Sequence, residues 1–513
     1  MVLFESMLTL LLVAIVLLQV SRRLSVPYPT MLALAGVVVA ALPWAPDIGI
    51  DPRLALALFI APALLDAAFD FPPRALRRYW LPLLALAAVA VLLTTAAVAW
   101  AGVALAGLPL AAAIALGAIV APPDAAAATA VLSRYSLPRR TVTVLKGESL
   151  LNDAVALLIF GAALSFSGTA TPTPALWGEI ALAVPGGLLL GLLIGRVYMR
   201  LRRFLAGTLG GTLFEFTATF GTWVIAEHLH LSAILAVVAY AMTVASTAPE
   251  RTSPRDRVHS YSVWGAVVFL LNVLAFLLMG LQARGIVLRL DAGELGHALG
   301  FAAVVFAIVV VVRMAWVLAY NRWAAWRRSP EPDAAPASLA ESLVVSWCGM
   351  RGLVTLATAL ALPAAFPSRD LIVLTALVVV LGTLIVQGLT LGPLIRRLRI
   401  KPDDSFGTEL NAARLRLVDA GIDSLAGQTG DDARSLLESY RKDRAIVAGG
   451  QHPRAVTELN DLRRRALATK RQRLVELRRS GEIDDDVFHA LEEELDWAEL
   501  AAAPPGRYEI IEN

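Results

Sequence analysis

The stretch Gly147–Phe160 (GESLLNDAVALLIF) places polar side chains inside an otherwise apolar run. Ser149 and Asp153 are four residues apart, so a helix would set them on one face. A hydroxyl and a carboxylate are hard oxygen ligands of the kind that small alkali cations accept, and the carboxylate also binds a proton. The spacing therefore predicts a site where a metal cation and a proton compete for Asp153.

A neighbouring face of the same stretch carries Glu148 and Asn152, again four residues apart. A carboxylate there needs a cationic partner, and the amide can brace the site by hydrogen bonds. A charge at the centre of a membrane helix costs roughly 2.5–3.5 kcal/mol on insertion scales. The alternative is that both faces only join helices by hydrogen bonds, and the cost of a mid-membrane aspartate argues against it.

Two further stretches combine charge with signals that break a helix. Pro122 and Pro123 remove two backbone donors directly before Asp124, within an apolar run that should cross the membrane. Broken helices at membrane depth line cavities and expose dipole ends, and Asp124 could cap the positive end of the second half-helix. A plain proline kink is the simpler alternative.

The second such stretch is SWCGMRGLVTLATALALP, in which Gly349 and Gly352 flank Arg351. Arg351 is the natural partner predicted for Glu148. Arg313, in the run AIVVVVRMAW, is expected either to balance negative helix ends or to extend toward water.

One more carboxylate, Asp66, lies in a third apolar run, LFIAPALLDAAFD. Two interpretations stay open for it: a second carboxylate beside the ion route, or a residue of the inner leaflet near water. The sequence shows no spacing typical of a metal centre beyond the Na⁺ ligands Asp153 and Ser149, so no resident cofactor is expected.

The elements that position these residues follow from composition. The 513 residues are 57% hydrophobic and 17% charged, too apolar for a soluble globular protein of this length. One cysteine, Cys348, excludes a disulfide scaffold. We therefore expect an all-α polytopic membrane protein.

Apolar runs of roughly 20 residues predict about 13 spanning helices, with approximate cores at 3–20, 29–45, 54–70, 79–101, 105–132, 141–166, 176–197, 207–227, 231–248, 261–283, 295–320, 339–362 and 370–396. The two interrupted stretches fall in the fifth and twelfth spans, seven spans apart. That spacing predicts inverted repeats with crossed, broken helices at a transport site.

Basic residues orient the spans. One set of alternating loops holds 19 Lys and Arg, and the other holds four. This asymmetry predicts an outside N-terminus and a cytoplasmic C-terminus. Residues 1–400 form the predicted transmembrane domain, and residues 401–513, with 17 basic and 23 acidic residues, form a helical cytoplasmic tail.

These motifs resemble the monovalent cation:proton antiporter-1 family, the sodium/proton exchanger group. GESLLNDAVALLIF is similar to the family signature, and SWCGMRGLVTLATALALP to its arginine–glycine span. FEFTATFGTWVIAEHLHLSAILAVV and LGTLIVQGLTLGPLIRRL are similar to its eighth–ninth and last spans. The resemblance covers about residues 1–400 and implies thirteen helices, a dimerisation domain, a moving core domain and a homodimer.

The resemblance also implies roles for single residues. Asp153 matches the ion- and proton-binding aspartate, Ser149 a ligand, and Asn152 the asparagine that marks electroneutral members. Glu148 with Arg351 matches a structural ion pair.

Asp66 takes the place of a family glutamate. The sequence departs from the family in the fifth span, where Pro123-Asp124-Ala125 replaces threonine–aspartate–proline. The missing threonine bears on cation selectivity.

Together these observations predict a bacterial-type secondary transporter of the inner membrane. It would exchange Na⁺ or Li⁺ for H⁺ by alternating access, without net charge movement, and serve pH and sodium homeostasis. A K⁺/H⁺ antiporter and a passive cation channel are the alternatives. An intramembrane protease is disfavoured because no Gly-x-Gly-Asp or Gly-x-Ser-x-Gly pattern occurs. The expected partners are monovalent cations, protons, the lipid bilayer and a second copy of the chain, and no nucleic acid.

Overall fold

The computed structural model describes residues 2–24, 28–40, 51–69, 73–124, 137–168, 174–287, 292–327, 338–400, 405–450 and 458–502, with a few single positions between these ranges. All regular structure in the described ranges is helical. The chain divides into two compact units, residues 1–402 and residues 403–512.

The first unit is built from consecutive helices. Its first half contains α1 (Val2–Leu24), α2 (Tyr28–Ala40), α3 (Pro52–Phe69), α4 (Pro73–Arg78), α5 (Trp80–Leu84), the π-helix η1 (Ala85–Val89), α6 (Ala90–Ala106) and α7 (Leu110–Val120). Its second half contains α9 (Arg139–Gly168), α10 (Pro174–Arg202), α11 (Leu209–His228), α12 (Ala233–Arg251), α13 (Pro254–Val287), α14 (Ala292–Trp326), α15 (Leu339–Trp347), α16 (Leu353–Leu360) and α17 (Arg369–Leu398).

Length and hydropathy mark many of these helices as membrane spans. Within the described residues, six stretches are long and apolar enough to cross a bilayer: Trp80–Ala106, Arg139–Phe166, Leu182–Arg202, Pro254–Leu278, Gly293–Trp326 and Arg369–Leu398. Shorter apolar helices occupy Leu11–Ser21, Leu54–Phe69, Leu110–Val120 and Ala233–Ala248. An all-α polytopic membrane protein is therefore the architecture, and the count of thirteen spans stays a prediction.

Both predicted helix interruptions are present. Helix α7 ends at Val120, and residues 121–124 are not helical. Helix α15 ends at Trp347, and α16 begins only at Leu353. The rest of the predicted fifth span lies outside the described residues, apart from isolated positions. The relation of the two broken helices by an inverted repeat stays a prediction.

One predicted boundary was wrong. The sequence placed the start of the fifth span at residue 105, but α6 continues to Ala106. Gly107 then adopts a left-handed conformation with φ of 61°, which ends the helix, and α7 begins after Pro109. The residues on both sides of this turn are mostly alanine and leucine, so mean hydropathy does not fall there and does not indicate the turn.

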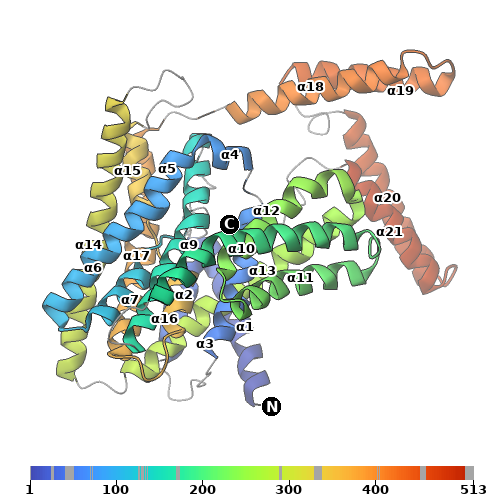
Figure 1. Cartoon of the computed structure of the whole chain (residues 1–513). Helices are drawn as coiled ribbons and strands as arrows, with labels where there is room; N and C mark the ends of the chain where they lie inside the picture. The colour runs from blue at the N-terminus through green and yellow to red at the C-terminus, as the bar shows by residue number, and fades with distance from the viewer. Residues whose placement is uncertain are drawn as a thin grey trace. The chain divides into compact units, whose positions relative to one another are not determined.

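Two packed groups of helices frame the site. Helices α6, α7, α9, α14 and α17 share a core that includes Leu116, Val309 and Val379. Helices α3, α10, α11 and α12 share another that includes Tyr198 and Tyr240. Figure 1 shows α14 running beside α6 in the first group. Helix α16 contacts both α3 and α17, so the interrupted helix lies where the two groups meet.

The described part of the second unit contains two helical hairpins: α18 (Ser405–Leu425) with α19 (Asp431–Ala448), and α20 (Glu458–Arg479) with α21 (Asp485–Ala502). Arg444 of α19 pairs with Asp419 of α18 at 2.6 Å. Arg471 of α20 pairs with Glu499 of α21 at 2.9 Å and also with Asp496. Charged contacts between partly exposed side chains therefore join each hairpin.

Candidate cation and proton site

The two helix interruptions touch each other through their backbones. The Asp124 N–H donates to the Met350 carbonyl at 2.7 Å. The Asp124 carboxylate accepts from the Leu353 N–H at 3.3 Å, at the first turn of α16. A Cβ on Gly352 would lie 1.7 Å from Asp124 Oδ2, so only glycine permits this approach.

Asp124 thus makes a contact that the sequence did not predict. Its carboxylate caps a half-helix of the other interrupted span, because the crossing brings the N-terminus of α16 to it. The N-terminus that follows Asp124 in its own span lies outside the described residues.

Arg351 compensates the opposite helix ends. Its guanidinium donates to the Val120 carbonyl at 3.0 Å and the Ala121 carbonyl at 3.1 Å, at the C-terminus of α7. It also donates to the Gly349 carbonyl, just beyond the C-terminus of α15. The side chain is 1% exposed. One positive charge therefore faces two negative helix ends at the crossing, while Asp124 faces a positive one.

The predicted partner of Glu148 was wrong. Arg313 of α14, not Arg351, forms the ion pair with Glu148: both terminal nitrogens donate to its two carboxylate oxygens, one at 3.1 Å and the other closer. The physical reason is that Arg351 is occupied by the helix-end carbonyls. Gly349 also leaves a passage for Arg313, since a Cβ there would lie 2.5 Å from Arg313 Cδ.

Arg313 retains part of its predicted role as well. One terminal nitrogen donates to the Val345 carbonyl in the last turn of α15 at 3.1 Å. The two arginines have thus exchanged the main roles that the sequence suggested for them.

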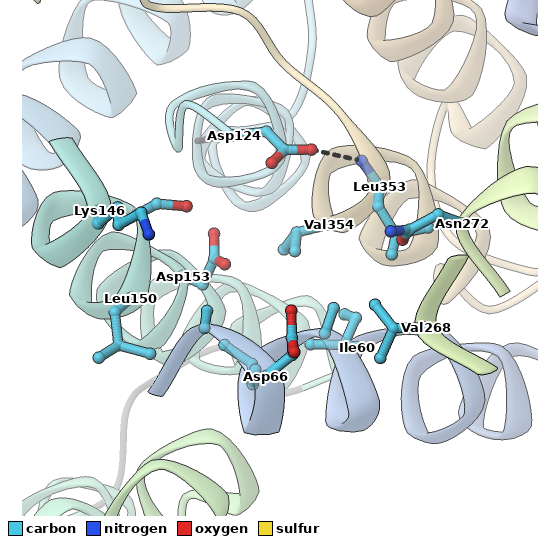
Figure 2. Close-up of a pocket in the computed structure, with 14 residues that line it drawn as sticks. Ile60, Asp66, Asp124, Lys146, Leu150, Asp153, Val268, Asn272, Leu353 and Val354 are labelled. Atoms are coloured by element: carbon cyan, nitrogen blue, oxygen red, sulfur yellow. Dashed lines mark hydrogen bonds between the residues drawn. The ribbon is translucent and has the colours of Figure 1, made fainter. Parts of the chain in front are cut away.

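A cavity of about 190 Å³ gathers four of the predicted site residues, Asp66, Asp124, Ser149 and Asp153. They come from α3, the break after α7, and α9. Figure 2 shows the three carboxylates turned toward one space, with Asp124 bonded to the Leu353 N–H. Asp153 is 6% exposed and makes no hydrogen bond or ion pair with the part of the chain that the structure describes.

Asn152 does not line this cavity. Its side chain is fully buried, and Nδ2 donates to the Pro123 carbonyl at 2.9 Å. The amide therefore braces the interruption after α7 from the other side of α9. Glu148, Arg313 and Arg351 also lie outside the cavity lining, so the predicted set divides into a cavity group and a scaffold group.

Two polar residues of the cavity lining, Lys146 and Asn272, are not among those that the sequence predicts. Lys146 lies on the cavity face of α9, three residues before Ser149 and seven before Asp153. That helical spacing could have revealed it, but its positive charge favours a basic loop instead. Asn272 reaches the cavity from the middle of α13, and nothing in the sequence connects it with the other residues.

The structure also describes Pro123, one of the positions at which the fifth span differs from the family motif. Pro123, at the position of the missing threonine, offers a backbone carbonyl to Asn152 and no side-chain oxygen. Ala125 lies outside the described residues. The described ligands that could hold a cation in the cavity are therefore carboxylates, the Ser149 hydroxyl and the Asn272 amide.

The chain matches the sequence model for the sodium/hydrogen exchanger transmembrane family over residues 7–397. It is 31% identical to an uncharacterised Na⁺/H⁺ exchanger of Mycobacterium tuberculosis, over 94% of this chain and 93% of that protein. It is 29% identical to a sodium, potassium, lithium and rubidium/H⁺ antiporter of Bacillus pumilus, over 81% of this chain and 65% of that protein.

Among solved structures, the sodium proton antiporter MjNhaP1 of Methanocaldococcus jannaschii is similar, with a TM-score of 0.59 and 18% identity. The match covers 78% of this chain and 99% of that one, and it indicates a shared fold. The chain therefore belongs to the sodium/hydrogen exchanger family of monovalent cation:proton antiporters, which are secondary transporters and not enzymes.

Proposed function

We propose that this chain exchanges Na⁺ or Li⁺ for H⁺, with the Asp153 carboxylate carrying either ion. The observation that supports this is the state of Asp153: a buried carboxylate that faces a cavity and has no bonded partner in the described residues. Ser149, one helical turn earlier, supplies a neutral oxygen beside it. A proton and a small cation then compete for one negative charge.

The cavity lining suggests how access could alternate. Asp124, Ser149 and Asp153 belong to the α7–α9 side of the unit, whereas Asp66 and Asn272 belong to α3 and α13. A shift of one side against the other would move Asp153 between openings on the two membrane faces. One titrating carboxylate implies one proton for each cation, and hence no net charge moved.

Flux in proteoliposomes tests the proposal. Vesicles with a trapped pH dye receive Na⁺, Li⁺ or K⁺ pulses at matched chloride, and proton efflux is compared with cation uptake. We expect saturable exchange with Na⁺ and Li⁺, and a proton-to-cation ratio of one. Exchange with none of these ions would refute the proposal.

K⁺/H⁺ exchange is the second candidate, and a specific comparison favours it. The similar protein of Bacillus pumilus is described as a sodium, potassium, lithium and rubidium antiporter. The absent threonine in the fifth span removes one small ligand, which would favour a larger ion. The same assay decides between the candidates, because a lower KM for K⁺ than for Na⁺ would identify a K⁺/H⁺ antiporter.

A passive cation channel would use the same carboxylates without coupling. An imposed proton gradient distinguishes the two mechanisms. Accumulation of the cation above its external concentration requires antiport, whereas a channel only equilibrates it.

We infer further that the chain lies in the inner membrane with its N-terminus outside and the unit of residues 403–512 in the cytoplasm. The basis is the unequal distribution of basic residues between alternating loops. We also infer a homodimer that serves pH and sodium homeostasis and needs only the transported ions. Glu482 is an exposed position between α20 and α21. Thiol labelling of a Glu482→Cys variant in intact and permeabilised cells tests the orientation.

A further inference from the structure

A second hollow, separate from the carboxylate cavity, lies between α14 and the α5–η1 segment. It is an apolar groove of about 420 Å³, and its walls include Leu84, Val89, Trp316, Ala319, Tyr320 and Trp323. Leu84 is 51% exposed and Trp323 is 38% exposed, so the groove opens to the surface of the unit. None of the carboxylate-cavity residues lines it.

A hydrogen bond joins the two walls of the groove. The segment Ala85–Val89 is a π-helix, and such insertions frequently occur at functional sites. The Trp316 indole N–H donates to the Ala85 carbonyl at 2.9 Å, which fixes the ring across the groove from α14 to η1. The aromatic wall is therefore positioned before any ligand arrives.

Two arginines lie against aromatic rings that line the groove or adjoin it. The Arg327 guanidinium lies 4.6 Å from the centre of the Trp323 ring. The Arg140 guanidinium lies 6.0 Å from the centre of the Tyr79 ring, and Tyr79 comes two residues before Leu81 of the groove wall. Neither arginine forms an ion pair with a carboxylate among the described residues. An apolar groove thus adjoins two arginines that form no ion pair with the described carboxylates.

This combination fits one kind of ligand in a membrane. Aromatic side chains and arginines are characteristic of the level of the lipid headgroups, and guanidinium groups bind phosphate through paired donors. We propose that the groove binds an anionic phospholipid, with an acyl chain against Leu84 and Trp316 and the headgroup phosphate between Arg140 and Arg327. Charge complementarity selects an anionic lipid, since a choline headgroup would add a third cation beside the two arginines.

The experiment uses the full chain, purified and delipidated in detergent. Binding of phosphatidylglycerol is measured by native mass spectrometry and by the shift of the thermal midpoint. Phosphatidylcholine with the same acyl chains is the lipid control, and inorganic phosphate is the headgroup control. We expect retention and stabilisation by phosphatidylglycerol alone. Equal binding of both lipids, or stabilisation by phosphate alone, would overturn the proposal.

Variants then locate the site. Each basic residue near an anionic headgroup contributes about fivefold to affinity. The double variant Arg140→Gln/Arg327→Gln should therefore bind phosphatidylglycerol about 25-fold more weakly. Arg203→Gln is the matched control, because Arg203 also stacks on an aromatic ring, at 4.7 Å from the centre of Phe204, but lies away from the groove. Unchanged affinity in the double variant would overturn the assignment.

A second variant serves if the double variant does not fold. Ala319→Trp fills the groove and retains both arginines, and it should abolish binding. Leu193→Trp, at a position 59% exposed on α10, adds the same side chain outside the groove and should bind as wild type. If Ala319→Trp instead converted a dimer into monomers, the groove would be an interface between two copies and the lipid assignment would be wrong.

Discussion

The two polar faces of α9 differ in how their charges are balanced, although they interleave within six residues. On one face Glu148 is paired with Arg313 and Asn152 is bonded to the Pro123 carbonyl. On the other face Ser149 and Asp153 open onto the cavity. The first face is bonded within the protein, whereas the second borders the cavity in which we propose that ions bind.

The comparison suggests how a structural charge inside a membrane would differ from one that carries an ion. A buried carboxylate whose oxygens are both bonded to arginine is held in a single state. A buried carboxylate that faces a cavity without a bonded partner must take its compensation from a proton or a cation. Residue type does not separate Glu148 from Asp153, whereas their surroundings do.

The largest expected effect separates these two carboxylates. Asp153→Asn keeps the shape of the side chain but removes the charge that a cation and a proton share, so exchange should fall to the level of empty vesicles. The thermal midpoint should stay at the wild-type value. The measurement is cation-induced dequenching of a pH dye in everted vesicles at matched protein levels, with thermal unfolding of the purified variant.

Glu148→Gln is the matched control, because it makes the same carboxyl-to-amide change on the other face of the same helix. It leaves Arg313 buried and unpaired, which should destabilise the protein by about 3–5 kcal/mol. Wild-type exchange in Asp153→Asn would mean that Asp124 or Asp66 carries the proton, and the two faces would not differ as described.

A double-mutant cycle sharpens the scaffold side of the comparison. Glu148→Gln combined with Arg313→Met should show a coupling on the order of 2–3 kcal/mol, because each change alone leaves a charge unpaired. Glu148→Gln combined with Arg351→Met should show about 1 kcal/mol or less, since Arg351 is bonded to carbonyl groups. Thermal midpoints of the single and double variants provide the couplings. A larger coupling of Glu148 with Arg351 than with Arg313 would contradict the ion pair seen here and support the one that the sequence predicts.

The choice of arginine that pairs with Glu148 could not be predicted from the sequence. Charge balance within an apolar chain predicts that Glu148 needs a cation, and two arginines stand in apolar runs that could supply it. The choice between them depends on which one meets the carbonyls at the end of α7, a contact across more than two hundred residues. Hydropathy carries no information about such a contact.

Other features of the structure could be predicted from the sequence. Proline and glycine placed both interruptions correctly, because their effect on a helix is local. Periodicity placed Ser149 and Asp153 on one face for the same reason. Asn272 could not be found, since only the packing of α13 beside the crossing brings its amide to the cavity.

Asn152→Asp tests whether the scaffold face can acquire a working charge. The Asn152 amide donates to the Pro123 carbonyl, and a carboxyl group can replace that donor only in its protonated form. We therefore expect the variant to remain electroneutral, with a rate within about tenfold of wild type. Solid-supported membrane recordings measure charge movement directly, and both proteins should give no sustained current. A current in the variant would show that a second carboxylate on α9 ionises during the cycle.

The smallest expected effect concerns Lys146, the positive charge on the cavity face of α9. Its ammonium adds repulsion to any cation that approaches Asp153, so Lys146→Gln should lower the KM for Na⁺ about two- to fivefold, as expected for charges several ångströms apart in a wet cavity. The maximal rate should change little, because Lys146 bonds to none of the described site residues. Arg200→Gln removes the same charge from an exposed position on α10 outside the cavity and should leave KM unchanged. The difference between the two variants should shrink when choline chloride raises the ionic strength, since screening weakens the repulsion. A higher KM in Lys146→Gln would instead mean that the ammonium positions a carboxylate for the ion, and Lys146 would then belong with the scaffold residues despite its place on the open face.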